Sequence, residues 1–244
     1  MIDRFAFTID GIEINCKPRQ TILSAALEAG VYIPHLCFHP SVPPHGSCRV
    51  CTVKANGRFV ASCTTPAEKG MVVLSENDKE LKDSRKAVVE MLFVEGNHYC
   101  MFCEKSGNCE LQAIAYRLGI LAPRFPYTFP RREVDSSHPG VFLDRNRCIQ
   151  CGRCVQISRD LDHKHVFELV GRGLETKLGV DSIAGLANTD LTAQDKSTMV
   201  CPVGAINIKG TAFRTPIGKR QYDRVPIGFE IEKARIEKKI SGES

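Results

Sequence analysis

Cysteine is the residue type in this 244-residue chain whose number and spacing point most directly to chemistry. Eleven of the twelve cysteines form three groups: Cys37, Cys48, Cys51 and Cys63; then Cys100, Cys103 and Cys109; then Cys148, Cys151, Cys154 and Cys201. Cys16 stands apart from all three. Thiolates bunched in C-x-x-C pairs are typical of metal sites, and a secreted disulfide framework would not bunch its cysteines this way. We therefore expect three metal centres.

The third group has the most specific pattern. Its motif CIQCGRC packs three cysteines into one tight loop, and the distant Cys201 is followed by Pro202. Such a loop and a remote Cys-Pro suit the four irons of a cubane, whereas zinc sites favour two separated C-x-x-C knuckles. Where a two-cluster ferredoxin would have a further cysteine, this chain has Ser158. The pattern predicts one [4Fe–4S] cluster.

The first group has the spacing C-x10-C-x2-C-x11-C, with a longer first gap than plant-type ferredoxins. Four thiolates converging on a loop of a small β domain predict a [2Fe–2S] cluster. A Rieske centre, which uses two histidines, is the alternative, because His35, His39 and His45 lie nearby. It would leave two well-spaced cysteines without a role, so we expect these histidines to be ordinary loop residues.

The second group, within GNHYCMFCEKSGNC, is one ligand short. A zinc site with His98 as fourth ligand is chemically allowed. The position between two predicted iron–sulfur sites favours a third cluster instead, with either His98 or Cys16 as the fourth ligand. Gly96 and Asn97 free the backbone to turn beside His98. Cys16 ends a predicted strand, where a small buried apolar side chain is expected. These residues favour His98 and leave Cys16 or an exogenous ligand open.

The elements that would carry these groups follow from pattern and turn signals. Residues 1–76 predict a β-grasp domain: a hairpin around Asp10-Gly11, a helix in TILSAALEAG, a second hairpin at Asn56-Gly57 and a last strand, MVVLS. Residues 77–122 predict a small helical domain, with a helix over 77–95 capped by Ser75 or Asn77, and another in CELQAIAYRLGI. The class expected is α+β.

In the remaining chain, a proline-rich segment and the last cysteine mark the predicted domain boundaries. Residues 123–212 predict a ferredoxin-like domain, preceded by a proline-rich linker over 121–140 and carrying an insertion, FELVGRGLETKLGV, with strand character. Residues 213–244 form a charged tail without cysteine, in part helical. We expect this tail to contact a partner.

Composition narrows the possible functions. Charged residues make up 25% of the chain, and neither a signal peptide nor an apolar run of about 18 residues is apparent, so we expect a cytoplasmic protein. The net charge of +5 invites a zinc-bound nucleic-acid module. However, eleven thiolates and three oxidised cores of about +2 each would bring the holoprotein near neutral. With no G-x-G-x-x-G motif, we expect no catalytic residue in this chain.

Two segments, EGNHYCMFCEKSGNCELQAIAYRLG and RCIQCGRCVQISRD, closely resemble the diaphorase small subunit of NAD-reducing, bidirectional [NiFe]-hydrogenases. Residues 1–212 also resemble the N-terminal region of the complex I large iron–sulfur subunit and of iron-only hydrogenases. In those two families the histidine lies four residues before the first cysteine. Here Gly96 occupies that position and His98 lies two residues before, which is typical of the hydrogenase-linked subunits.

The resemblance implies an electron-transfer subunit with one [2Fe–2S] and two [4Fe–4S] clusters. The implied ligand sets are Cys37, Cys48, Cys51 and Cys63; His98, Cys100, Cys103 and Cys109; and Cys148, Cys151, Cys154 and Cys201. The implied partners are an FMN- and NAD(H)-binding diaphorase large subunit and the small and large subunits of a [NiFe] hydrogenase, with no nucleic acid and no membrane span. An electron-transfer subunit of a formate dehydrogenase or of a complex I-like module remains the alternative.

Overall fold

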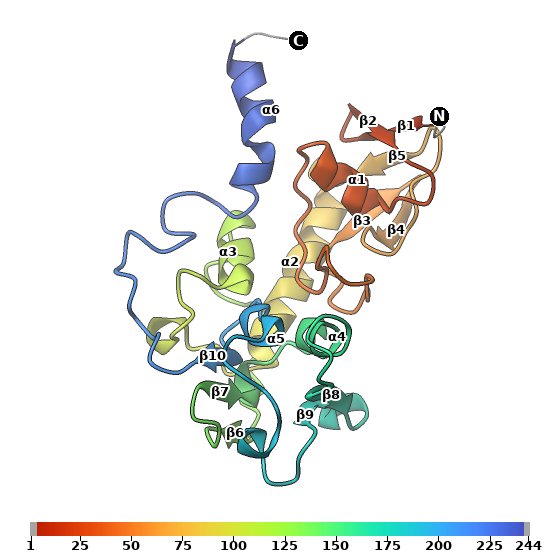
Figure 1. Ribbon diagram of the computed structural model, residues 1–244. Coiled ribbons are helices and arrows are strands. Elements are labelled where there is room, and N and C mark those ends of the chain that lie inside the picture. The colour runs from red at the N-terminus through yellow and green to blue at the C-terminus, as the bar shows by residue number, and fades with distance from the viewer. Residues whose placement is uncertain (1–3, 242–244) are drawn as a thin grey trace.

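A computed structural model describes residues 4–241 of the protein (Figure 1). The N-terminal unit is a mixed sheet in the order β2-β1-β5-β3-β4, crossed by α1. Its elements are β1 (Phe5–Ile9), β2 (Ile12–Cys16), α1 (Ile22–Glu28), β3 (Thr52–Ala55), β4 (Arg58–Ala61) and β5 (Val72–Leu74). Both predicted hairpins are confirmed. Asp10-Gly11 and Asn56-Gly57 adopt the positive φ angles that such two-residue turns require.

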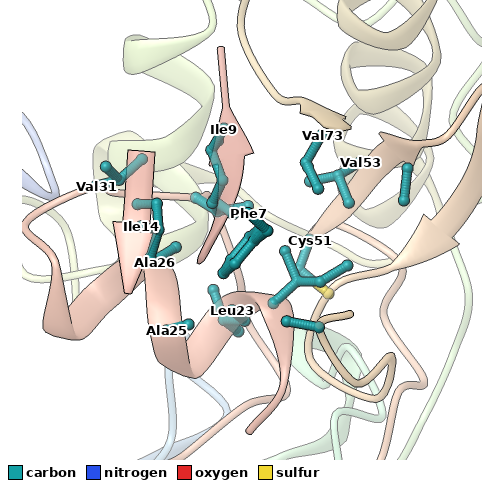
Figure 2. Close-up of a cluster of buried hydrophobic side chains, with 14 of the residues drawn as sticks. Phe7, Ile9, Ile14, Leu23, Ala25, Ala26, Val31, Cys51, Val53 and Val73 are labelled. Atoms are coloured by element: carbon teal, nitrogen blue, oxygen red, sulfur yellow. The ribbon is translucent and has the colours of Figure 1, made fainter. Parts of the chain in front are cut away.

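The core of this unit lies between α1 and the sheet. Figure 2 shows Phe7 and Ile14 from the strands facing Leu23 and Ala26 from the helix. The alternation in β1 and β2 directs every second side chain inward, while α1 contributes its apolar face. Cys16 belongs to this same core and is fully buried.

Two helices follow: α2 (Lys79–Val94) and α3 (Glu110–Arg117). Figure 1 shows α2 running from the N-terminal sheet toward the C-terminal half of the molecule. The cap of α2 differs from our expectation, because Asp78 takes the position assigned to Ser75 or Asn77. Its carboxylate accepts a hydrogen bond of 2.8 Å from the Leu81 N–H.

The C-terminal half is built from short elements around a three-stranded sheet in the order β10-β7-β6. They are β6 (Val134–Asp135), β7 (Val141–Asp144), α4 (Arg153–Asp160), β8 (Phe167–Val170), β9 (Lys177–Val180), α5 (Lys196–Met199) and β10 (Ile206–Ile208). The insertion with strand character forms the β8–β9 hairpin. The proline-rich segment is mostly irregular, but its end contributes β6 to the sheet.

One hydrophobic cluster joins all the predicted domains. Its buried members come from the N-terminal unit, α2, α3, the third cysteine group and the tail, and include Leu36, Val89, Ile114, Ile149, Val203 and Ile227. The helical end of the tail is α6 (Phe229–Ser241), which projects away from the body in Figure 1. Its first turn is anchored, because the Arg117 guanidinium forms a two-pronged ion pair with Glu232. None of the helices within residues 4–241 is long and apolar enough to cross a membrane.

Candidate metal centres

The first site gathers its four thiols from loops at one end of the N-terminal unit. Cys37, Cys48, Cys51 and Cys63 are all buried. The neighbouring Cys48 and Cys63 side chains hold the pKa of Cys37 below its usual range. The Cys63 side chain also lowers the pKa of Cys51, to about 7. The four thiols therefore lie near one another.

The nearby histidines do not join these thiols. His35 is buried, but its Nδ1 is hydrogen-bonded to the Ile33 carbonyl at 2.7 Å. His39 accepts a bond of 3.3 Å from the Ser41 N–H. His45 lies beside the third group, since a Cβ placed on Gly152 would be 3.7 Å from its Cδ2 atom. The structure thus brings the four thiols together and gives His35 and His39 other hydrogen-bond partners.

The third site is a small cavity. Its four cysteines, Cys148, Cys151, Cys154 and Cys201, all line that cavity together with apolar side chains. Positive φ angles at Gln150 and Gly152 let the short C-x-x-C-x-x-C loop wrap around it. Burial raises the pKa of Cys148 to about 11 and also raises the pKa values of Cys151 and Cys154. These three thiols would therefore be neutral without metal, and metal binding must release their protons.

The second site is more open than the first. Cys100 lies in a single 3-10 turn, η1 (Cys100–Phe102), and Cys109 caps α3. Cys100 and Cys103 are only half-buried, while Cys109 is buried, which raises the pKa of its thiol to about 12. Met101 and Phe102 point outward, with 86% and 75% of their surface exposed. Exposed apolar side chains thus lie directly beside two half-buried cysteines of this site.

His98 lies next to the second site. Its ring packs edge-on against Phe93 at 5.5 Å, and it lines a cavity of about 230 Å³ together with Cys100. Among the described residues its Nε2 atom is buried without a hydrogen-bond partner. Burial, reinforced by the nearby Arg147 charge, lowers the pKa of His98 to about 4. The imidazole is therefore neutral and has a free lone pair, as metal ligation requires.

Cys16 does not approach the second site. Its side chain is buried between β2 and α1, and its sulfur donates to the Lys17 carbonyl at 3.2 Å. A second contact, of 3.6 Å, reaches Gln20 Oε1. The structure therefore brings His98 close to the cysteine group and keeps Cys16 in the N-terminal core.

A single metal ion and an iron–sulfur cluster place different demands on donor geometry. A structural zinc ion needs donors that converge on a single point. Within residues 4–241, no group of three or more His, Cys, Asp or Glu side chains has an arrangement that could hold one ion. Iron–sulfur clusters distribute their ligands over several irons, which suits thiols that line a common cavity.

Sequence reasoning missed four charged residues between the second and third sites. Arg147 contacts Glu104 and donates a hydrogen bond of 3.7 Å to the Cys103 sulfur. Arg153 forms a two-pronged pair with Glu110, with both distances 2.8 Å. A signal was present in the sequence, because each glutamate directly follows a cysteine of the second group and each arginine directly precedes one of the third.

Three families of iron–sulfur domains match successive parts of the chain. Residues 3–78 match a 2Fe-2S iron-sulfur cluster binding domain. Residues 85–124 match the NADH-ubiquinone oxidoreductase-G iron-sulfur binding region. Residues 141–208 match a 4Fe-4S single cluster domain. The cofactors are therefore one [2Fe–2S] and two [4Fe–4S] clusters, as predicted.

Relatives match over most of the chain. The NAD-reducing hydrogenase HoxS subunit gamma of Cupriavidus necator is 45% identical over 88% of this chain and 92% of its own length. The mitochondrial NADH-ubiquinone oxidoreductase 78 kDa subunit of Candida albicans is 34% identical over 85% of this chain, which spans only 29% of that protein. A chain in a crystal structure of an NAD+-reducing [NiFe]-hydrogenase matches with a TM-score of 0.88 and 49% identity, over 91% of this chain and 94% of that one. The chain belongs to the gamma-subunit family of NAD-reducing hydrogenases.

Proposed function

We propose that this chain relays single electrons between a [NiFe] hydrogenase module and a subunit that binds FMN and NAD(H). The chain is an iron–sulfur subunit of an NAD-reducing hydrogenase, and carries no catalytic site of its own in this proposal. The observation that carries it is the match over nearly the whole gamma subunit, combined with three cysteine groups packed around one hydrophobic cluster. The complex I relative gives weaker support for a complex I-like role, because the chain spans under a third of it.

The proposed ligand sets follow from the donors at each site. Cys37, Cys48, Cys51 and Cys63 would hold the [2Fe–2S] cluster; His98, Cys100, Cys103 and Cys109 one [4Fe–4S] cluster; and Cys148, Cys151, Cys154 and Cys201 the other. When bound, these clusters supply reversible one-electron chemistry. The orphaned Nε2 atom of His98 and the cavity shared by the third group support the assignment. The protein excludes water and provides hydrogen bonds to sulfur.

The contacts between sites support an order that differs from the order in the sequence. On one side of the third site, Gln156 in α4 donates to the Pro43 carbonyl, beside the first site, at 3.1 Å. On the other side, Arg147 contacts Cys103 of the second site. The Pro202 carbonyl also accepts a bond of 2.8 Å from the Glu110 N–H. We therefore order the sites first, third, second.

The second site is our candidate for exchange with a partner's redox centre. Its half-buried Cys100 and Cys103 flank two strongly exposed apolar residues, Met101 and Phe102. The proposed partners remain the FMN- and NAD(H)-binding diaphorase large subunit and the [NiFe] small and large subunits.

The segment of the tail that we propose for partner contact is shorter than the one the sequence suggested. Arg117 holds the start of α6 on this chain through its ion pair with Glu232 and a hydrogen bond of 2.8 Å to the Ile227 carbonyl, and its cation lies over the Tyr32 ring at 4.8 Å. Ile236 lies beyond this anchor and is exposed, and we propose the end of α6 as a segment for partner docking. Truncation after Arg235 keeps the Glu232 anchor, and we expect it to weaken co-purification of a partner subunit. Unchanged recovery of the complex would remove the tail from the interface.

The relay is tested in the native complex. The co-purified complex should contain nickel and reduce NAD+ with hydrogen. We expect Cys201→Ser to abolish this overall reaction, while reduction of an artificial dye by NADH at the flavin subunit continues. If hydrogen-driven NAD+ reduction persisted after loss of the third cluster, this chain would not be the relay.

A further inference from the structure

Two ion pairs join the second and third sites through residues adjacent to the proposed ligands. Arg147 precedes Cys148 and pairs with Glu104, which follows Cys103. Six positions later in each segment, Arg153 precedes Cys154 and pairs with Glu110. Because both pairs are largely buried, their charges act across a low dielectric and are weakly screened.

The two arginines differ in one respect. Arg147 Nη1 donates to the Cys103 sulfur at 3.7 Å in addition to its pair with Glu104. Arg153 is held by both carboxylate oxygens of Glu110, and its Nε atom is buried without a partner among the described residues. The Cys103 contact is also tightly packed, since a Cβ on Gly204 would lie 2.7 Å from that sulfur.

We propose that Arg147 is a positioning residue that raises the reduction potential of the second centre through its hydrogen bond to Cys103. This inference rests on the proposed ligand set of that centre. One-electron reduction adds one negative charge there and makes or breaks no bond, and the electron comes from NADH or hydrogen through the partner subunits. A guanidinium N–H directed at the thiolate stabilises the more negative state.

Glu104 opposes this effect, so removal of its charge should shift the reduction potential in the direction opposite to removal of Arg147. Its carboxylate pairs with Arg147, as does Asp144, whose Oδ2 lies 3.0 Å from the Arg147 Nε atom. Removing the Glu104 charge leaves Arg147 less neutralised and should raise the potential. Removing the Arg147 charge should lower it. A purely structural loosening of the site would not give opposite signs.

The test is an EPR-monitored redox titration of the complete hydrogenase complex, with iron content measured for every variant. For Arg147→Gln we expect the ratio of reduced to oxidised second centre, at fixed ambient potential, to fall at least tenfold, which is about 59 mV for one electron. Glu104→Gln should raise that ratio. Arg153→Gln is the matched control, because it breaks an equivalent pair without removing a hydrogen bond to Cys103, and it should shift the second centre less.

Opposite shifts in the Arg147 and Glu104 variants support the inference. Shifts of the same sign, or an unmoved second centre with full iron in Arg147→Gln, overturn it. If Arg147→Gln loses iron, the test rests on Glu104→Gln. A reduction potential of the second centre that does not rise in Glu104→Gln then overturns the inference. Failure of the proposed ligand set would look different, since the wild-type signal assigned to the second centre would then not respond to His98→Ala.

Discussion

The first site has only buried thiols, whereas the second site has two half-buried thiols and depends on hydrogen bonds to the C-terminal half of the chain. All four thiols of the first site are buried, and two of them belong to the core formed by α1 and the N-terminal sheet. At the second site the Asn97 N–H donates to the Asn146 carbonyl, and the Glu110 N–H to Pro202, both at 2.8 Å. Half of the first site thus lies in the core of its own domain, while Cys37 and Cys48 belong to the shared hydrophobic cluster. The second site depends on the C-terminal half.

The largest difference between the two sites is expected when one proposed cysteine ligand is removed from each. The holoprotein should contain about ten irons. We expect Cys51→Ser to remove about two of them and leave both [4Fe–4S] signals intact. Cys109→Ser should remove about four and also lower occupancy of the third site, because Cys109 precedes the Glu110 contact to Pro202. Iron analysis and EPR of the purified complex measure both effects.

Independent loss of the second cluster in Cys109→Ser, with a fully occupied third site, would contradict the dependence described above. Cys16→Ser is the control for both variants. Its sulfur contacts only the N-terminal core and nearby polar atoms, so iron content should stay at the wild-type level.

The histidine of the second site has the next largest expected effect. His98→Ala should change the EPR signal of one [4Fe–4S] centre and spare the other two, because it removes a single neutral ligand. His39→Ala is the matched control at the first site, where His39 bonds only to a backbone N–H. A spectrum unchanged by His98→Ala would exclude His98 as a ligand and favour an exogenous one.

A buried arginine beneath the first site should matter for local stability. Arg85 in α2 is fully buried and donates to the carbonyls of Thr52, at 2.7 Å, and Ser75, at 3.1 Å. Arg85→Met leaves both carbonyls unpaired, with an expected loss of about 2 kcal/mol. Amide hydrogen exchange in β3 should accelerate about thirtyfold.

Lys82→Met on the same helix is the control for Arg85, because Lys82 is exposed. It should leave exchange in β3 unchanged. Equal exchange rates in the two variants would show that Arg85 does not secure the first site to α2.

Alanine substitutions at two glycines, Gly204 and Gly57, should have the smallest effects. Gly204→Ala would bring a Cβ to 2.7 Å from the Cys103 sulfur, closer than packing allows, so that sulfur must shift. We expect an altered line shape of the second centre with full iron. Gly57→Ala meets open space at the far hairpin but has a φ of +81°, so it should cost about 1 kcal/mol locally and change no EPR signal. A line shape unchanged in Gly204→Ala would indicate that the site tolerates displacement of Cys103.

The sequence predicted the local features well because each has a short-range cause. The hairpins follow from Asp10-Gly11 and Asn56-Gly57, and the cluster types follow from cysteine spacing, as the matching families confirm. The cap of α2 was wrong by one residue, since Asn77 and Asp78 are both good caps and tertiary packing selects between them. The spatial order of the sites and the Arg147–Glu104 pair could not be predicted, because they depend on how segments more than 40 residues apart pack together.

Iron stoichiometry tests the central claim most directly. Mössbauer spectra of the anaerobically purified, iron-57-labelled complex, corrected for iron carried by the partner subunits, should assign about ten irons to this chain. About one fifth of them should belong to a [2Fe–2S] centre and the remainder to two [4Fe–4S] centres, one of which responds to His98→Ala. A chain that contains stoichiometric zinc, or only one [4Fe–4S] centre, would contradict the assignment of three electron-transfer sites.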